Sequence, residues 1–240
     1  MIQFYAPDIE TTLQLPESDS AHAVRVLRMM DGDELQVIDG KGITYQCRLT
    51  EAHPKRARVE ILSAASTPLP WKQQITVAVA PTKHLDRMEW LTEKLTEVGV
   101  NRIIPMLCAR SERKELKVQR LEKIAVSAMK QSLKATLPTI DEMTPYNEIV
   151  KSMAGTTVKA IAYCDDEIKR TDFTDLYIPG ADTIILIGPE GDFTPAEVAS
   201  ALDAGFTAVT LGNNRLRTET ATLYAVSACH VLDQSNHINI

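Results

Sequence analysis

The sequence lacks the residue clusters that bind metal ions in proteins. Its 240 residues include only four cysteines and five histidines. Successive cysteines are 61, 56 and 65 residues apart, and the sequence has no Cys-x-x-Cys pair or Cys/His group with zinc spacing. We therefore expect reduced thiols, no metal and no metal-dependent catalysis. The four thiols are Cys47, Cys108, Cys164 and Cys229.

Long apolar runs are also missing. The first residues, Met1 to Pro7, lack the basic stretch and apolar core of a secretory signal. No segment approaches the ~20 apolar residues that a membrane helix needs. Hydrophobic residues make up 44% of the chain and charged residues 24%, which is typical of globular proteins. The sequence therefore predicts a cytoplasmic protein that does not bind a membrane.

Two common nucleotide-binding loops are missing as well. The chain has no Gly-x-Gly-x-x-Gly motif, which binds dinucleotides, and no phosphate-binding loop with Lys followed by Ser or Thr. A nicotinamide-dependent enzyme on a doubly wound sheet therefore lacks its fingerprint in this sequence.

The charges are unevenly distributed along the chain. The net charge of −6 argues against nucleic acid as a partner. However, residues 110–134 contain eight Lys or Arg and three Glu, which give +5, whereas residues 135–240 contain six basic and fifteen acidic residues, which give −9. This basic segment, 110–134, is either a solvated helix face or a surface that contacts phosphates. In the second case Arg113 and Lys117 are candidate RNA-binding residues.

The first 63 residues predict a small β-rich domain. Three short segments alternate between apolar and polar residues and are separated by turns rich in Asp, Gly and Pro. These segments are 34–38, 43–49 and 56–62. The turns leave no room for a crossover helix, so we expect antiparallel pairing in a meander or a barrel. We expect a helix over 22–30, and a linker over the Pro-containing stretch 64–70.

Beyond this linker, strand-like and helix-like segments alternate, which predicts a parallel sheet flanked by helices. The expected strands are 74–80, 102–106, 158–163, 183–187 and 208–211. The expected helices are 85–98, 117–134, 146–153, 195–204 and 220–232. The clearest helix start is 194–197, where Thr194 is the N-cap, Pro195 is the first helical residue and Glu197 completes a capping box.

Two polar loops follow strands of this expected sheet. Ligands bind at the carboxyl ends of the strands in an open parallel sheet, so we expect a site at the loops after Ile187 and Leu211, which we place at the ends of adjacent strands. The glycines of the first loop, 188–193, allow close approach of the backbone to a ligand. The second loop, 212–218, leads directly into an apolar helix.

The residues around the start of that helix have two interpretations. Thr218 and Glu219 can be simple helix-capping residues, or they can belong to the site. Arg217 precedes the helix, where no cap needs a cation, so a functional role is the better interpretation for this residue.

The motifs in these loops resemble those of a known family. They are Ile187-Gly188-Pro189-Glu190-Gly191, Leu211-Gly212 and Leu216-Arg217-Thr218-Glu219-Thr220-Ala221. They resemble the signature of the bacterial 16S rRNA uridine-N3 methyltransferases, the ribosomal RNA small subunit methyltransferase E family of the SPOUT class. The resemblance spans the chain and includes His22, Val26-Leu27-Arg28, Lys94, Glu97, Gly99, Ser111-Glu112, Gln131-Ser132 and Pro138.

The resemblance implies an α/β fold with two domains. Residues 69–240 would form a SPOUT-type methyltransferase domain with a parallel sheet and a C-terminal trefoil knot. Residues 1–68 would form a PUA-like β-barrel that binds RNA. A homodimer is implied too, because the class shares its sites across a subunit interface. We expect apolar residues of the last helix to contribute to it, namely Leu223, Val226, Val231 and Leu232. The implied substrate is a specific uridine in the decoding region of 16S rRNA, in the small ribosomal subunit.

The cofactor implied by the resemblance is S-adenosylmethionine, lying between the two loops and held largely by backbone groups. The residues expected to bind it are Ile187, Gly188, Pro189, Glu190, Gly191, Leu211, Gly212, Leu216, Arg217 and Thr218.

Methylation of uridine at N3 requires loss of the N3 proton and stabilisation of the negative charge left on the base. Arg217 is our candidate for this stabilisation, since a guanidinium directs two donors at an anion without giving up a proton. Glu219 is either the general base or a structural residue that orients Arg217 or caps the helix.

Other residues of the family pattern concern RNA binding. Three residues are spaced at i, i+3 and i+6 along the expected N-terminal helix, close to one helical face: His22, Arg25 and Arg28. They either contact RNA or are solvated charges. Three positions depart from the family pattern. Lys130 stands where Glu is usual, Lys134 where Arg is usual, and Asp192 where a second Gly is commoner.

Two other functional classes remain open at this point, together with one variant of the chemistry. The classes are a nicotinamide-dependent enzyme and a non-catalytic RNA-binding module whose second domain is only structural. Among methyltransferases, methylation of a ribose 2′-hydroxyl is the nearest alternative to methylation of the base.

Overall fold

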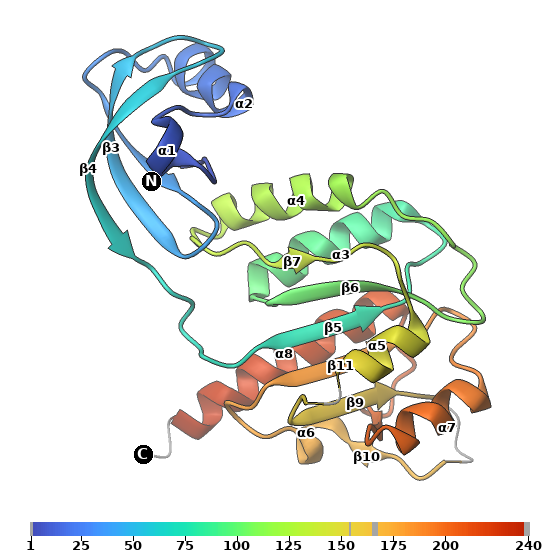
Figure 1. Ribbon diagram of the computed structural model, residues 1–240. Helices are drawn as coiled ribbons and strands as arrows, with labels where there is room; N and C mark the ends of the chain where they lie inside the picture. Colours follow the sequence, from blue (N-terminus) through green and yellow to red (C-terminus); the bar gives the residue numbers. More distant parts are fainter. Residues whose placement is uncertain (1, 154, 165–167, 238–240) are drawn as a thin grey trace. The chain divides into compact units, whose positions relative to one another are not determined.

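The computed structural model describes residues 2–153, 155–164 and 168–237 and divides into two compact units (Figure 1). The first unit comprises Met1–Pro70 together with Val126–Leu137. The second comprises Trp71–Ala125 together with Pro138–Ile240. Helix α4 (Val118–Gln131) therefore contributes its second half to the first unit.

The first unit contains a four-stranded sheet with the strand order β1-β2-β3-β4. Its strands are β1 (Gln3–Tyr5), β2 (Glu34–Ile38), β3 (Ile43–Glu51) and β4 (Arg58–Ser66). The pairs β2–β3 and β3–β4 are antiparallel, which confirms the pairing expected from the short turns. Strand β1 was not expected and pairs in parallel with β2. Strand β4 reaches Ser66, so the expectation of a linker from residue 64 is wrong for its first three residues.

The helices of the first unit differ from the sequence prediction. They are α1 (Ile9–Thr12), α2 (Glu17–Ala21) and η1, a π-helix over His22–Val26. The expected α-helix over 22–30 is therefore wrong in both type and length. The backbone N–H of Leu27 donates to the carbonyl of His22, which closes the wider π turn. Arg28 then adopts a left-handed backbone with φ of 58°. His22, Arg25 and Arg28 consequently do not share one α-helical face.

The second unit contains an eight-stranded sheet in which all strand pairs are parallel, as expected. The strand order is β10-β12-β9-β11-β5-β6-β7, and β8 also pairs with β6. The strands are β5 (Ile75–Val79), β6 (Arg102–Leu107), β7 (Thr139–Ile140), β8 (Thr144–Pro145), β9 (Val158–Ala162), β10 (Thr171–Asp172), β11 (Thr183–Ile187) and β12 (Thr207–Thr210). The short strands β7, β8 and β10 were not expected.

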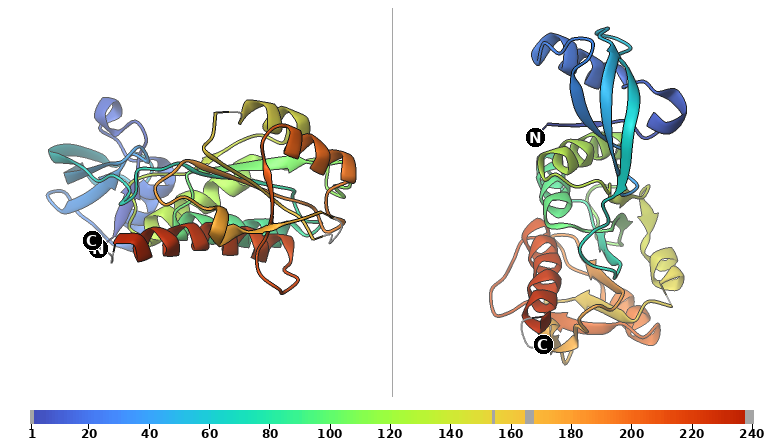
Figure 2. Two further views of the ribbon diagram at one scale, coloured as in Figure 1. Left: turned by 90° about the horizontal axis from the view of Figure 1, so that it is seen from below. Right: turned by 90° about the vertical axis from the view of Figure 1, so that its left-hand side faces the viewer.

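Helices cover both faces of this sheet (Figure 2). Side chains alternate between the faces along each strand, so Val77 and Val79 of β5 face one layer while Ala78 faces the other. The first layer contains α3 (Leu85–Val98), α6 (Phe173–Leu176) and α8 (Thr218–His237). The second contains α5 (Tyr146–Ser152) and α7 (Pro195–Asp203).

Local signals in the sequence explain where two of these helices begin and end. The predicted capping box of α7 is present, with both the Thr194 and the Glu197 side chains bonded to the backbone. Helix α3 ends at Gly99, whose φ is 107°. A Cβ atom there would lie 2.1 Å from the Trp71 ring, so this position requires glycine for two reasons. Of the helices described, none combines the length and apolar character needed to span a bilayer.

Candidate active site

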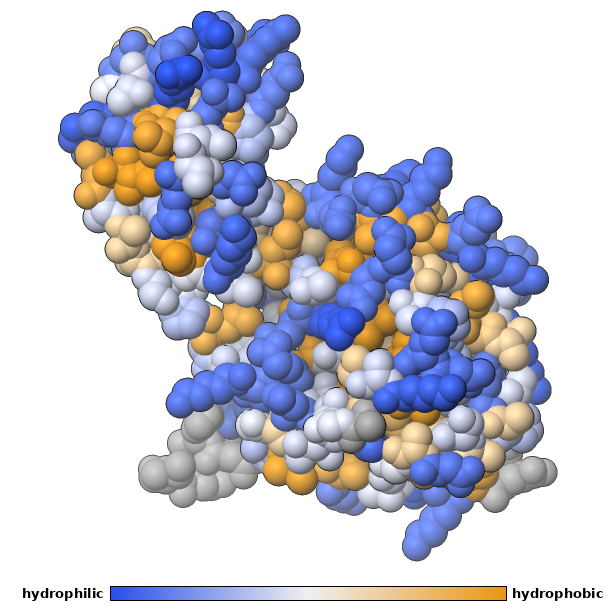
Figure 3. Space-filling model, viewed as in Figure 1, coloured by the Kyte–Doolittle hydropathy of each residue, from blue (hydrophilic) through white to orange (hydrophobic). Residues whose placement is uncertain are grey.

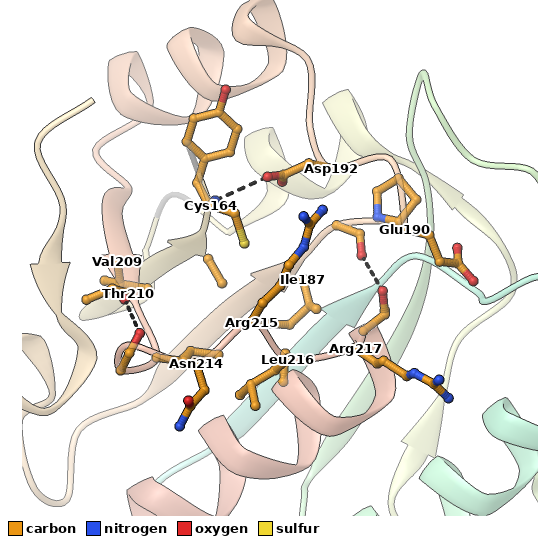
Figure 4. A pocket seen from close by; sticks show the side chains of 18 of the residues that line it. Cys164, Ile187, Glu190, Asp192, Val209, Thr210, Asn214, Arg215, Leu216 and Arg217 are labelled. Atoms are coloured by element: carbon orange, nitrogen blue, oxygen red, sulfur yellow. Dashed lines mark hydrogen bonds between the residues drawn. The ribbon is translucent and has the colours of Figure 1, made fainter. Parts of the chain in front are cut away.

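A pocket of about 1020 Å³ lies at the carboxyl ends of β9, β11 and β12 (Figure 4). This is the edge of the parallel sheet where the sequence predicted a ligand site. Strand β9 lies between β11 and β12. The expectation that the two glycine-containing loops follow adjacent strands is therefore wrong, because the end of β9 separates them and contributes to the pocket.

The pocket combines apolar walls with charged side chains and main-chain groups. Its apolar lining residues include Ala162, Ile187, Val209, Leu211, Leu216 and Ala221. Its charged lining residues are Arg87, Arg170, Glu190, Asp192, Arg215 and Arg217. Such a pocket suits a ligand with one flat apolar part and one charged part.

Most of the predicted cofactor-binding residues line this pocket. From the first loop these are Ile187, Gly188, Pro189 and Glu190, and from the second they are Leu211, Gly212, Leu216, Arg217 and Thr218. Gly191 is exposed and lies just outside the lining, where its carbonyl accepts a hydrogen bond of 2.9 Å from Arg110.

The loop between β11 and α7 is fixed from several sides. The hydroxyl of Thr218 donates to the carbonyl of Gly188 over 3.1 Å, which ties the start of α8 to this loop. The carboxylate of Glu190 accepts from the backbone N–H of Lys83 at 3.2 Å. Arg110 donates to the carbonyl of Phe193 as well as to that of Gly191. The loop is therefore preorganised by contacts from three other segments of the second unit.

Arg217 occupies the residue position immediately before α8. Its carbonyl accepts a hydrogen bond of 2.7 Å from the N–H of Ala221, which is the first bond of the helix. A cation is unfavourable here, because the N-terminal end of a helix already carries partial positive charge. Arg217 is also exposed and lines the pocket, so its charge and that of the helix end both favour an anion at this place.

The other predicted catalytic residue lies elsewhere. Glu219 is buried in the first turn of α8, outside the pocket lining, and forms an ion pair with Arg87 of α3. Arg87 itself lines the pocket. The arrangement makes Glu219 a partner of a pocket arginine rather than a group that faces the pocket.

Several lining residues were missed by the sequence analysis. Tyr163 and Cys164 follow β9, whose carboxyl end the rule for parallel sheets would have included. Arg170 and Arg215 also line the pocket. In the view of Figure 4, Arg215 and Arg217 extend in different directions from the loop that they share.

The basic segment 110–134 has a partly structural role. Arg113 donates from Nε to the carbonyl of Thr82 at 3.1 Å and from Nη2 to that of Lys83 at 2.6 Å. Arg120 lies 2.6 Å from the carboxylate of Glu89. Three lysines of the segment are exposed, in a region where hydrophilic side chains project from the surface over α4 and the preceding loop (Figure 3). These are Lys114, Lys117 and Lys123.

The predicted RNA-binding residues of the first unit are accessible to solvent. Arg25 and Arg28 are exposed, and His22 is half-buried with its ring 6.0 Å from that of Phe4.

Comparisons with known proteins agree with this geometry. Residues 69–230 match the family model of the RNA methyltransferase domain, and residues 15–62 match that of the RNA methyltransferase PUA domain. The chain is 28% identical to ribosomal RNA small subunit methyltransferase E of Bacillus subtilis (strain 168), over 90% of this chain and 89% of that protein.

Solved structures are similar along nearly the whole chain. The crystal structure of a probable rRNA methyltransferase from Porphyromonas gingivalis has 45% identity and a TM-score of 0.94, covering 98% of this chain and 100% of that one. The structure of ribosomal RNA small subunit methyltransferase E from Neisseria gonorrhoeae, bound to S-adenosyl methionine, has 32% identity and a TM-score of 0.85. It covers 97% of this chain and 98% of that one.

Proposed function

Because this chain belongs to the ribosomal RNA small subunit methyltransferase E family of RNA methyltransferases, we propose that it methylates N3 of a uridine in 16S rRNA. The methyl donor is S-adenosylmethionine, and the substrate is the small ribosomal subunit. The observation that carries the proposal is the position of Arg217, a cation at the N-terminal end of α8 that lines the pocket.

The residues of the pocket fit the proposed cofactor. Ile187, Leu211 and Leu216 provide apolar walls for an adenine ring, and main-chain groups of the two loops are available for its polar edge. The space beside Gly212 is open, since a Cβ atom built there meets no atom within 4 Å, and its φ of 90° favours glycine. When bound, the cofactor supplies a methyl group activated by its attachment to a sulfonium.

Arg217 would act on the uracil rather than on the cofactor. Loss of the N3 proton leaves negative charge on the base oxygens, and a guanidinium together with the helix end stabilises that charge. The proton would leave to water or to another group of the RNA complex, because Glu219 is buried against Arg87.

RNA would be bound by cations of both units. In the first unit, Arg25 and Arg28 are exposed beside His22. In the second unit, Lys114, Lys117 and Lys123 are exposed and suit contacts with phosphates better than Arg113, which holds the loop after β5. We propose that the first unit is a PUA-like barrel that binds RNA. We also propose that the protein acts in the cytoplasm.

The proposal includes a homodimer and a trefoil knot around the loop from Leu211 to Thr220. The surface of α8 exposes Tyr224 and Val231, and α3 exposes Trp90, which are apolar groups suited to a subunit interface. Val226 was expected to contribute but is completely buried in the core of the second unit. Light scattering of the purified chain tests the dimer: a monomer that still methylates RNA would contradict it.

The catalytic proposal is tested by changing Arg217. We expect Arg217→Ala to lower turnover on small ribosomal subunits about 100-fold, the scale for loss of one preorganised donor, with cofactor affinity changed only a few-fold. Arg217→Lys is the matched variant, because it keeps the positive charge and loses the bidentate guanidinium donor. Its turnover should lie between that of the wild type and that of Arg217→Ala. Higher pH should partly restore the Ala variant, because hydroxide deprotonates more of the N3 sites.

Mass spectrometry of digested 16S rRNA identifies the product. 3-Methyluridine formed at the wild-type rate by Arg217→Ala would contradict the role of Arg217. A methyl group on ribose would contradict methylation of the base.

A further inference from the structure

Asp192 has an unusual backbone conformation at the wall of the pocket. Its φ is 61°, a left-handed conformation that Asp and Asn adopt more readily than other side chains, although glycine adopts it at the lowest cost. The backbone alone therefore gives no reason for a carboxylate at this position.

The carboxylate of Asp192 is held in place by two backbone groups. Oδ1 accepts a hydrogen bond of 2.8 Å from the N–H of Phe193. Oδ2 accepts one of 3.1 Å from the N–H of Cys164, just beyond the end of β9 (Figure 4). Each carboxylate oxygen has two acceptor positions, so both retain one for a ligand. These two hydrogen bonds fix the orientation of the carboxylate at the wall of the pocket.

A second charge of opposite sign comes from the other loop. Arg215 is exposed and lines the same pocket, and in the view of Figure 4 its side chain extends toward the end of the pocket that holds Asp192 and Cys164. Glu190, the other lining carboxylate, already accepts from the N–H of Lys83 in the β5–α3 loop. Arg170 also lines the pocket, but its guanidinium donates to the carbonyl of Tyr163. The Asp192 carboxylate and the Arg215 guanidinium thus come to this end of the pocket from two different loops.

We infer that Asp192 and Arg215 bind the amino-acid end of the methyl donor. That end is a zwitterion, so the Asp192 carboxylate would accept from its ammonium group and the Arg215 guanidinium would donate to its carboxylate. The inference rests on the proposed function, since it takes S-adenosylmethionine as the ligand. It explains why a charged residue stands at position 192 in this chain.

Two ligands separate recognition of this end from general effects on the pocket. S-adenosylhomocysteine carries the amino-acid end, whereas 5′-methylthioadenosine has the same adenosine part without it. We expect Asp192→Asn and Arg215→Gln each to raise the dissociation constant of S-adenosylhomocysteine about ten-fold or more, as measured by calorimetry. This is the scale of one lost hydrogen bond to a charged group. Both variants should bind 5′-methylthioadenosine as the wild type does. Asn suits the first test because it tolerates the left-handed backbone and is neutral.

Each test variant has a control that removes a charge of the same sign outside the pocket lining. Asp175→Asn is the control for Asp192→Asn, and Lys151→Gln is the control for Arg215→Gln. Both controls change exposed residues and should bind both ligands as the wild type does. Thermal unfolding of each variant confirms that the loop change has not unfolded the second unit. If Asp192→Asn weakened the binding of both ligands equally, the inference would be overturned, and Asp192 would only stabilise the loop conformation. Unchanged binding of S-adenosylhomocysteine would overturn it as well. A wild type that binds neither ligand would instead refute the proposed function.

Discussion

The Nε atom of Arg87 lies 3.7 Å from Oε1 of Glu219, and the Glu219 side chain is only 10% exposed. The pair joins the first turn of α8 to α3, beside the pocket that Arg87 lines. The second oxygen of Glu219 is buried and accepts no hydrogen bond among the described residues. A general base must reach the proton that it removes, and this carboxylate faces a cation instead.

We therefore predict that Glu219 positions Arg87 and is not the base. Glu219→Gln keeps the size of the side chain and removes its charge, so turnover should fall less than about ten-fold, whereas loss of a general base costs 100-fold or more. The dependence of turnover on pH should keep its shape. Methylation assays from pH 6 to 9 measure both quantities. A 100-fold loss together with a changed pH profile would restore Glu219 as the base.

In the first unit, Lys130 forms a partly buried ion pair. Its Nζ atom lies 2.5 Å from Oδ1 of Asp19, whose side chain is 8% exposed. The same oxygen accepts from the N–H of Tyr5, and Lys130 lies 6.0 Å from the centre of the Phe4 ring. Lys130 thus attaches the end of α4 to the N-terminal strand, which gives this departure from the family pattern a structural reason.

Lys130→Glu should therefore destabilise the first unit, because it places two carboxylates together at a partly buried site. We expect a loss of about 3 kcal/mol in the free energy of unfolding. Asp19→Asn in the same chain should recover part of the loss, since it removes the repulsion. Hydrogen exchange of the amides in β2 and β3 reports on this unit. Unchanged protection in Lys130→Glu would show that the ion pair contributes nothing.

A third prediction concerns the C-terminal part of α8. The carboxylate of Asp233 accepts hydrogen bonds from the hydroxyl of Tyr177, the N–H of Gly180 and the side chain of Gln73. Asp233→Ala leaves these donors without their acceptor and should cost about 2–3 kcal/mol, whereas Asp203→Ala, at an exposed position, should cost less than about 0.5.

Fluorescence measures this loss in the second unit, because both tryptophans, Trp71 and Trp90, belong to it. Urea unfolding of the two variants gives the comparison. Equal midpoints would contradict the anchoring role of Asp233.

Elements defined by local chemistry were predictable from the sequence. Strand β11 is apolar after Thr183 and buried on both faces, so its bounds, Thr183–Ile187, match the prediction. Helix α3 matches too, because its apolar period continues up to the glycine that ends it. The two loops that line the pocket were predictable because their glycines follow strands of the expected sheet.

Features that depend on contacts distant in sequence were not predictable. The placement of β9 between β11 and β12 follows from the order of strands in space. The ion pair between Arg87 and Glu219 joins residues from two helices far apart in the chain. Gly188 has a second reason to be glycine, since a Cβ atom there would lie 3.1 Å from ring carbons of buried Phe193. The local sequence around each residue contains no sign of these neighbours.

The last prediction concerns stability in alkaline solution and follows from buried thiols. Cys47 in β3 is completely buried, and burial raises its pKa from 9.0 to about 11. Burial likewise raises the pKa of Tyr45, whose hydroxyl also faces Glu10, from 10.0 to about 12. In the folded chain these groups therefore stay protonated at pH values where the unfolded chain ionises them.

The sign of the pH effect follows from proton linkage. Below pH 9 the Cys47 thiol is protonated in the folded and in the unfolded chain, so its contribution to the free energy of unfolding is fully present. Between pH 9 and about 11 only the unfolded chain loses the proton, and the free energy of unfolding falls by about 1.4 kcal/mol per pH unit for each such group.

We predict that Cys47→Ala lowers the stability at pH 7 but makes the decrease of stability with pH less steep above pH 9. Val59→Ala is the matched control, because Val59 is buried in the same sheet and has no proton to lose. It should keep the wild-type slope, measured by amide protection in β2 and β3 from pH 8 to 11 after correction for the intrinsic exchange rate. A slope that is the same in Cys47→Ala and in Val59→Ala would show that ionisation of this thiol does not limit alkaline stability.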